Sequence, residues 1–155
     1  EIELLGKGYV LVGWPGDGPT HREVTHTTSK SGRVRAKKGA HTSIPVAAIA
    51  LVHEFGSPAN NIPERPVMRK TNRAYSRALA FAMARVVRQI YAGKLLPSMA
   101  LKQLGVFWEG RIKTMFREGF FAPLKPSTIA AKGSSKPLID SGQLRQSVTS
   151  RVVGL

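Results

Sequence analysis

The chain has no cysteine among its 155 residues. Disulfide bonds, thiolate metal sites and a cysteine nucleophile are therefore excluded. Acidic residues are also scarce, because Asp and Glu number 9 against 24 Lys and Arg, which gives a formal net charge of +15. A surface of this kind favours polyanions, such as nucleic acid, acidic protein faces or anionic lipid.

Long hydrophobic runs are missing as well. The longest apolar segment, Ile44–Val52, contains a proline and is much shorter than the ~18 residues that span a bilayer. We therefore expect no contact with a membrane. Hydrophobic residues nevertheless make up 42% of the chain, which is enough for a buried core. The length suits one domain over residues 1–155.

The pattern of apolar residues predicts an α+β fold in which both ends of the chain supply strands to one small antiparallel or mixed sheet. β-branched and aromatic residues indicate strands within Glu1–Trp14 and Ser147–Val153. Spacing by three and four residues indicates two long helices packed across that sheet, Val67–Ala92 and Ser98–Glu118. Shorter helices are expected at Ser43–Phe55, at Ser127–Lys132 and after Asp140, with Ser43, Ser98 and Asp140 as N-caps.

A polar and basic segment, Thr20–Thr42, separates the first strand from the first helix. Its few large apolar residues cannot bury much surface, so it predicts a long loop or a two-stranded arm with Ser31-Gly32 at the tip. The positive charges of this basic arm favour an acidic protein partner or DNA equally. The basic candidates in it are Arg22, Lys30, Arg33, Arg35, Lys37 and Lys38.

Patterns for catalysis and metal binding are weak. His53-Glu54 lacks the second histidine that a zinc-protease helix needs, because position 57 is Ser. Asp140-Ser141-Gly142 is no nucleophile elbow, and Gly6-Lys7-Gly8 is too short for a phosphate-binding loop. We therefore expect no enzyme, no cofactor and no metal site. Salt bridges are the expected role of Glu54, Glu64, Glu109 and Glu118.

Arginines form a row on the first long helix. Arg69, Arg73 and Arg77 recur every four residues and therefore share one face, and no acidic residue occurs between Val67 and Gly93. The row suits either acidic neighbours in an oligomer or the phosphates of nucleic acid. A sequence-neutral nucleic-acid-binding module is therefore one function that the sequence supports.

Two segments are similar to motifs of the tail-completion and head–tail joining (neck) proteins of tailed bacteriophages. In the first, a helix ends with His53-Glu54-Phe55-Gly56 and precedes the turn Ile62-Pro63-Glu64-Arg65-Pro66 and a long helix. In the second, Pro137–Val148 reads Pro-Leu-Ile-Asp-Ser-Gly-Gln-Leu-Arg-Gln-Ser-Val. The opening strand, Tyr9–Pro15, is also similar, so the resemblance extends from that strand to the end of the chain.

The resemblance implies a structural virion protein that assembles in the host cytoplasm into an oligomeric ring joining tail to head. Its implied partners are copies of itself and neighbouring neck, adaptor, tail-terminator or tail-tube proteins. The DNA that passes through the channel is a further implied contact. On this interpretation the subunit-interface candidates are Phe55, Arg65, Arg69, Arg73 and Arg77.

Overall fold

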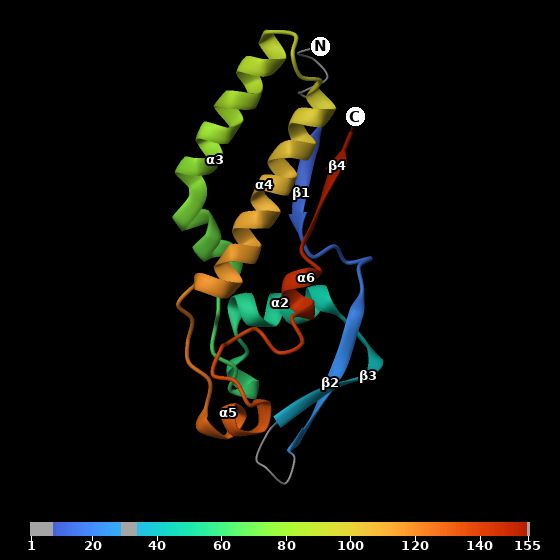
Figure 1. Ribbon diagram of the computed structural model, residues 1–155, viewed down its shortest axis with the longest axis vertical. Helices are drawn as coiled ribbons and strands as arrows, with labels where there is room; N and C mark the ends of the chain where they lie inside the picture. The colour runs from blue at the N-terminus through green and yellow to red at the C-terminus, as the bar shows by residue number, and fades with distance from the viewer. Residues whose placement is uncertain (1–7, 29–33, 155) are drawn as a thin grey trace.

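The computed structural model describes residues 8–28 and 34–154, with the backbone alone for residues 21–28 and 34–43. The fold is α+β, as expected (Figure 1). Strands β1 (Tyr9–Gly13) and β4 (Thr149–Val153) pair antiparallel, and Tyr9 lies opposite Val153. The two ends of the described chain therefore form one small sheet, which confirms that prediction.

Two long helices form the layers beside this sheet. Helix α4 (Pro97–Glu118) packs against both strands, and α3 (Val67–Tyr91) packs against α4 (Figure 1). The prediction placed both helices across the sheet, whereas α4 takes the position next to it. A glycine makes this close approach possible, because a Cβ on Gly105 of α4 would lie 2.8 Å from Cβ of Ser150 in β4.

Among the described residues, two apolar clusters along α4 form most of the core. The larger cluster lies where α4 meets the start of α3 and the residue before β4, and Trp14 packs edge-on against it. Trp14 also donates its indole N–H to the carbonyl oxygen of Leu144 at 2.7 Å. The smaller cluster holds the far ends of α3 and α4 together. Its buried members are Val86, Ile90 and Ala100, and those of the larger cluster are Val67, Ile112, Met115, Phe116 and Val148.

The basic arm is a β-hairpin of β2 (Thr20–Thr28) and β3 (Val34–Pro45), which confirms the two-stranded alternative. The tip expected at Ser31-Gly32 lies outside the described residues. Two hydrogen bonds anchor the base of the hairpin to the body. The backbone N–H of Val46 donates to Pro19 O at 3.0 Å, and the side-chain amide of Gln143 donates to Thr20 O at 2.8 Å.

Several helix starts differ from the prediction. Helix α2 (Val46–Phe55) begins after Pro45 rather than at Ser43, because β3 continues to Pro45, which pairs with Thr20. Strand pairing therefore overrides the capping preference of serine. Helix α4 begins with Pro97 in its first turn, where the missing N–H costs nothing, so Ser98 does not cap it.

Short helices complete the fold: η1 (Pro58–Asn60), α5 (Pro126–Lys132) and α6 (Gln143–Gln146). The residue before α6 is Gly142, with φ of 80°, so the predicted N-cap role of Asp140 is wrong. The tight turn needs a residue with positive φ at the capping position, and only glycine adopts that conformation readily.

Candidate subunit-contact surfaces

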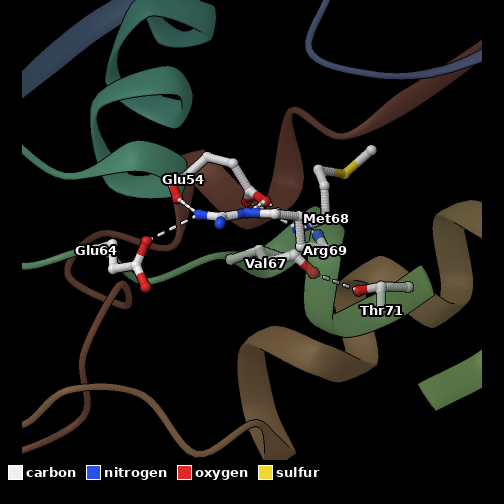
Figure 2. Close-up of polar contacts among 6 residues, drawn as sticks. All are labelled: Glu54, Glu64, Val67, Met68, Arg69 and Thr71. Carbon is white, nitrogen blue, oxygen red and sulfur yellow. Dashed lines mark hydrogen bonds and ion pairs between the residues drawn. The ribbon is translucent and has the colours of Figure 1, made fainter. Parts of the chain in front are cut away.

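A buried carboxylate joins the end of α2 to the start of α3. Glu54, the second-to-last residue of α2, is 8% exposed. Its two oxygens accept the backbone N–H groups of Met68 at 2.9 Å and Arg69 at 3.0 Å (Figure 2). These N–H groups belong to the first turn of α3, which has no side-chain cap from its own N-cap residue. Glu54 therefore caps α3 from another helix.

Arg69 is held within the same joint. Its guanidinium pairs with Glu54 at 3.3 Å and with Glu64 at 3.0 Å, and it also donates to the carbonyl oxygen of Glu54 (Figure 2). The guanidinium carbon lies 5.3 Å from the centre of the Phe55 ring. These contacts confirm the expected salt bridges of Glu54 and Glu64. They also separate Arg69 from the other arginines of the row, because its charge is already neutralised inside the chain.

Arg65 has an internal role that the sequence did not indicate. The residue is only 6% exposed, and it donates from Nε to Ala122 O at 2.9 Å and from Nη2 to Pro123 O at 3.2 Å. The prediction that Arg65 faces a neighbouring subunit is therefore wrong for this guanidinium, which ties the turn before α3 to the segment after α4. Burial also lowers the pKa of Arg65.

Arg73 and Arg77 are exposed along the outer side of α3, as the interface prediction requires. Within the described part of the chain, neither side chain forms an ion pair, and the same holds for Arg85 and Arg88 further along the helix. This helix therefore presents several uncompensated positive charges to whatever lies beside it.

Phe55 is also exposed, at 63%. The chain reverses directly after it at Gly56, where φ is 74° and an added Cβ would lie 2.9 Å from the backbone nitrogen of Glu64. Glycine is thus required there by both conformation and space. The sharp reversal leaves the phenylalanine ring at the surface, which suits the predicted interface position.

Large exposed apolar side chains gather on elements where the sequence analysis expected only core or charge. On α3, Phe81 and Tyr91 are 71% and 73% exposed, and Phe120 after α4 is 93% exposed. For Phe81 and Tyr91 the signal in the sequence was an aromatic residue on the arginine-bearing side of a helix that already had a complete apolar stripe. Other members of this exposed set are Tyr9, Leu11, Leu96, Met99 and Val106.

A cavity of about 360 Å³ lies beside α2, between α5 and α6. Its lining includes His53, Arg65, Lys132 and Asp140. Nδ1 of His53 is buried and has no hydrogen-bond partner within the described residues. Burial lowers the pKa of His53, and the charges of Arg65 and Lys132 lower it further. Burial and both charges therefore favour the neutral form of the imidazole.

Four basic-arm candidates lie in the hairpin strands, with Arg22 in β2 and Arg35, Lys37 and Lys38 in β3. Lys30 and Arg33 lie outside the described residues. In the part of the chain that the structure describes, no three His, Asp or Glu side chains group as metal ligands. No helix in that part is long and apolar enough to cross a membrane.

Comparisons of this chain with protein-family models, with curated proteins and with solved structures found no match.

Proposed function

We propose that this chain is a structural protein, not an enzyme, of the neck or tail-completion region of a tailed bacteriophage. In this proposal it forms an oligomeric ring that joins the tail to the head within the virion. Its neighbours there are copies of itself and adaptor, tail-terminator or tail-tube proteins. The DNA in the channel passes close to its basic residues.

The observation that carries the proposal is the amount of large apolar side chain at the surface. Phe55, Phe81, Tyr91, Leu96 and Phe120 are all more than 60% exposed in a chain of 155 residues. Large apolar side chains that stay exposed in one chain are candidates for burial against other protein surfaces. Burial of each such side chain stabilises an assembly by about 1.5–3 kcal/mol, so a few of them supply a strong driving force.

The joint around Glu54 and Arg65 adds support to the resemblance. Arg65 of the first motif reaches the carbonyl oxygens of Ala122 and Pro123, close to the chain segment that leads to the second motif. Residues of both motifs, among them His53 and Asp140, also line the same cavity. A rigid joint lowers the entropy cost of binding a neighbouring subunit, because the surface needs little ordering.

The oligomeric state of the purified chain tests the proposal. We expect sedimentation velocity to detect a closed oligomer, and electron microscopy to image it as a ring. Phe55→Ser should shift the distribution toward monomer by about tenfold in dissociation constant, while the helical circular dichroism stays unchanged. Gln103→Ser, at an exposed polar position on α4, is the control. A chain that remains monomeric at every concentration, alone and with purified virion proteins, would refute the proposal.

A second candidate function is sequence-neutral binding of nucleic acid. It is favoured by Arg73, Arg77, Arg85 and Arg88, which form no ion pair within the described residues. Binding of duplex DNA should weaken linearly in log affinity as log salt concentration rises. Ring formation should instead become stronger as the salt concentration rises, because salt screens the repulsion between chains of charge +15. Gel shifts and sedimentation at two salt concentrations therefore separate the two functions.

A further inference from the structure

The outer face of α3 carries a second ordered stripe, apart from the face that it buries. Its positions follow one another at intervals of three or four residues, which is the spacing of a coiled-coil seam. Most of its members are apolar, and the others are arginines. We call this stripe the α3 seam, and it consists of Ala74, Arg77, Phe81, Ala84, Arg88 and Tyr91.

The α3 seam has no partner within the described chain. The buried residues of α3, among them Thr71, Val86 and Ile90, lie on the other side of the helix, toward α4. Figure 1 shows α4 and the strands together on that side. Phe81 stands at the rim of a groove of about 280 Å³ between α3 and α4, and yet it is 71% exposed. A helix that has already buried one apolar stripe does not need a second one for its own folding.

The charges of the α3 seam exclude a second copy of the same face as its occupant. Arg77 and Arg88 lie in the seam, and Arg73 and Arg85 lie beside it. No acidic residue occurs anywhere in α3. Two copies placed seam to seam would bring arginines against arginines with no carboxylate between them, which is destabilising. The occupant must therefore bring negative charge of its own.

The spacing of the aromatic residues favours a protein helix over a nucleic-acid duplex. Phe81 and Tyr91 are ten residues apart on one helix, which corresponds to about 15 Å at a rise of ~1.5 Å per residue. The backbone of a nucleic-acid duplex would satisfy the arginines but would place charged phosphates against both rings, because the bases of a duplex are stacked inside it. A partner helix presents apolar side chains at intervals of three and four residues, so it matches the rings and the arginines together.

We propose that the α3 seam docks an amphipathic acidic helix of a different protein. Apolar residues of that helix would pack against Phe81 and Tyr91, and Ala84 between them allows the two backbones to approach closely. Glu or Asp residues at the edges of the partner's apolar stripe would pair with Arg77 and Arg88. The inference rests on the proposed function for the assembly that contains this partner, and it deepens that function by naming the partner's chemistry.

A synthetic helical peptide tests the inference without the unidentified partner. The probe has three heptads with Leu at the two core positions and Glu at the flanking positions, and fluorescence anisotropy measures its binding to the full chain. We expect saturable binding that weakens with salt. The double variant Phe81→Ser/Tyr91→Ser should weaken binding about tenfold or more, with unchanged circular dichroism because both side chains are exposed.

Charge-matched controls separate the α3 seam from general attraction to a basic protein. The variant Arg77→Glu/Arg88→Glu should abolish binding. The control Lys102→Glu/Arg117→Glu makes the same change of charge at exposed positions of α4, and it should leave most of the binding intact. A peptide of the same composition without the heptad spacing should bind weakly. Equal losses in both charge variants, or no loss in Phe81→Ser/Tyr91→Ser, would overturn the inference.

Two further outcomes also count against the inference. Tighter binding of duplex DNA than of the peptide, lost on Arg77→Glu/Arg88→Glu alone, would assign the α3 seam to nucleic acid. Self-association of the chain that Phe81→Ser/Tyr91→Ser abolishes would assign it to a second copy. Ring formation without the peptide is a separate measurement. If the peptide does not bind while the oligomeric ring still forms, the docking role of the α3 seam is refuted and the proposed function is not.

Discussion

At the scale of single residues, Glu54 illustrates how a charge becomes tolerable in the interior. Removal of a carboxylate from water is costly unless hydrogen bonds replace the lost hydration. Glu54 accepts two backbone N–H groups of α3 and pairs with Arg69, so both of its oxygens are satisfied. The positive end of the α3 dipole adds further stabilisation.

We expect Glu54→Gln to destabilise the fold by about 1–3 kcal/mol. The side-chain NH₂ of the glutamine would face a backbone N–H of α3, and two donors cannot form a hydrogen bond. One hydrogen bond is therefore lost along with the ion pair. Thermal unfolding should record a decrease of roughly 2–4 °C per kcal/mol. Glu64→Gln removes only the exposed partner of Arg69 and should lower the midpoint far less. Equal effects of the two substitutions would contradict the role of Glu54 as the cap.

These residue roles were only partly predictable. The salt bridges of Glu54 were expected because arginines follow it in the sequence. Its capping of a second helix, and the contact of Arg65 with two carbonyl oxygens, depend on chain segments that only folding brings together. The separation of Arg65 from Pro123 is 58 positions, and no periodicity relates such distant sites. The sequence therefore suggested a contact of Arg65 with a neighbouring subunit instead of this contact within the chain.

At the scale of elements, the contact between α4 and the β1–β4 sheet depends on a glycine inside a helix. Gly105 is buried, and an added Cβ would lie 2.8 Å from Cβ of Ser150 and 2.9 Å from Cγ2 of Val10. A glycine in a helix costs about 1 kcal/mol relative to alanine. The fold accepts this cost because the small residue lets α4 lie close to both strands.

Gly105→Ala should therefore destabilise the chain by about 1–3 kcal/mol, since overpacking outweighs the gain in helix propensity. Gly110 in the same helix has nothing within 4 Å of its added Cβ. Gly110→Ala should accordingly stabilise the chain by up to about 1 kcal/mol. Urea denaturation of the two variants measures the contrast. A stabilising Gly105→Ala would show that the helix can move away from the sheet without cost.

The elements were largely predictable, and their ends were not. Spacing by three and four residues identified α3 and α4 because both helices bury one continuous stripe. The start of α2 was placed too early because the competing partner of Pro45 is Thr20, far back in the chain. Similarly, the cap expected from Asp140 gave way to Gly142, since the turn before α6 needs a positive φ.

At the scale of the whole molecule, we expect His53 to lower the stability of the fold in mild acid. Its pKa in the folded chain lies below the usual 6.5, chiefly through burial and then through Arg65 and Lys132. Between the folded pKa and 6.5, His53 therefore binds more protons in the unfolded chain than in the folded chain. Stability is complete above that pH and decreases as the pH falls toward the folded pKa. Asp17 and Glu109 lose their stabilising charge only at lower pH, because their usual pKa values are 3.8 and 4.5.

The thermal midpoint of the native chain should consequently decrease as the pH is lowered from 7.5 to about 5. His53→Gln removes the ionisable group from the cavity wall, so its midpoint should vary much less over the same range. The other histidines, His21, His26 and His41, lie in the hairpin segment. Replacement of these three residues by Gln is the control, and it should leave the decrease intact. A variant His53→Gln with an unchanged pH profile would assign the acid sensitivity elsewhere.

The candidate contact surfaces were the least predictable part of the whole. The charge of +15 and the exposed Arg73 and Arg77 follow directly from composition and helical spacing. The exposure of Phe81 and Tyr91 did not follow, because an aromatic residue in a helix ordinarily joins the core. Only the placement of α3 as the outer layer leaves these rings uncovered.

The link made by Arg65 has a consequence for how related chains would differ. Its acceptors are backbone oxygens, which every amino acid supplies, so the side chains at positions 122 and 123 contribute nothing to the recognition. Drift of residue type at those two positions should leave the link unharmed, whereas a deletion that shortens the loop should break it. Natural selection would therefore have to preserve the arginine and the length of the loop, but no particular side chain at positions 122 and 123.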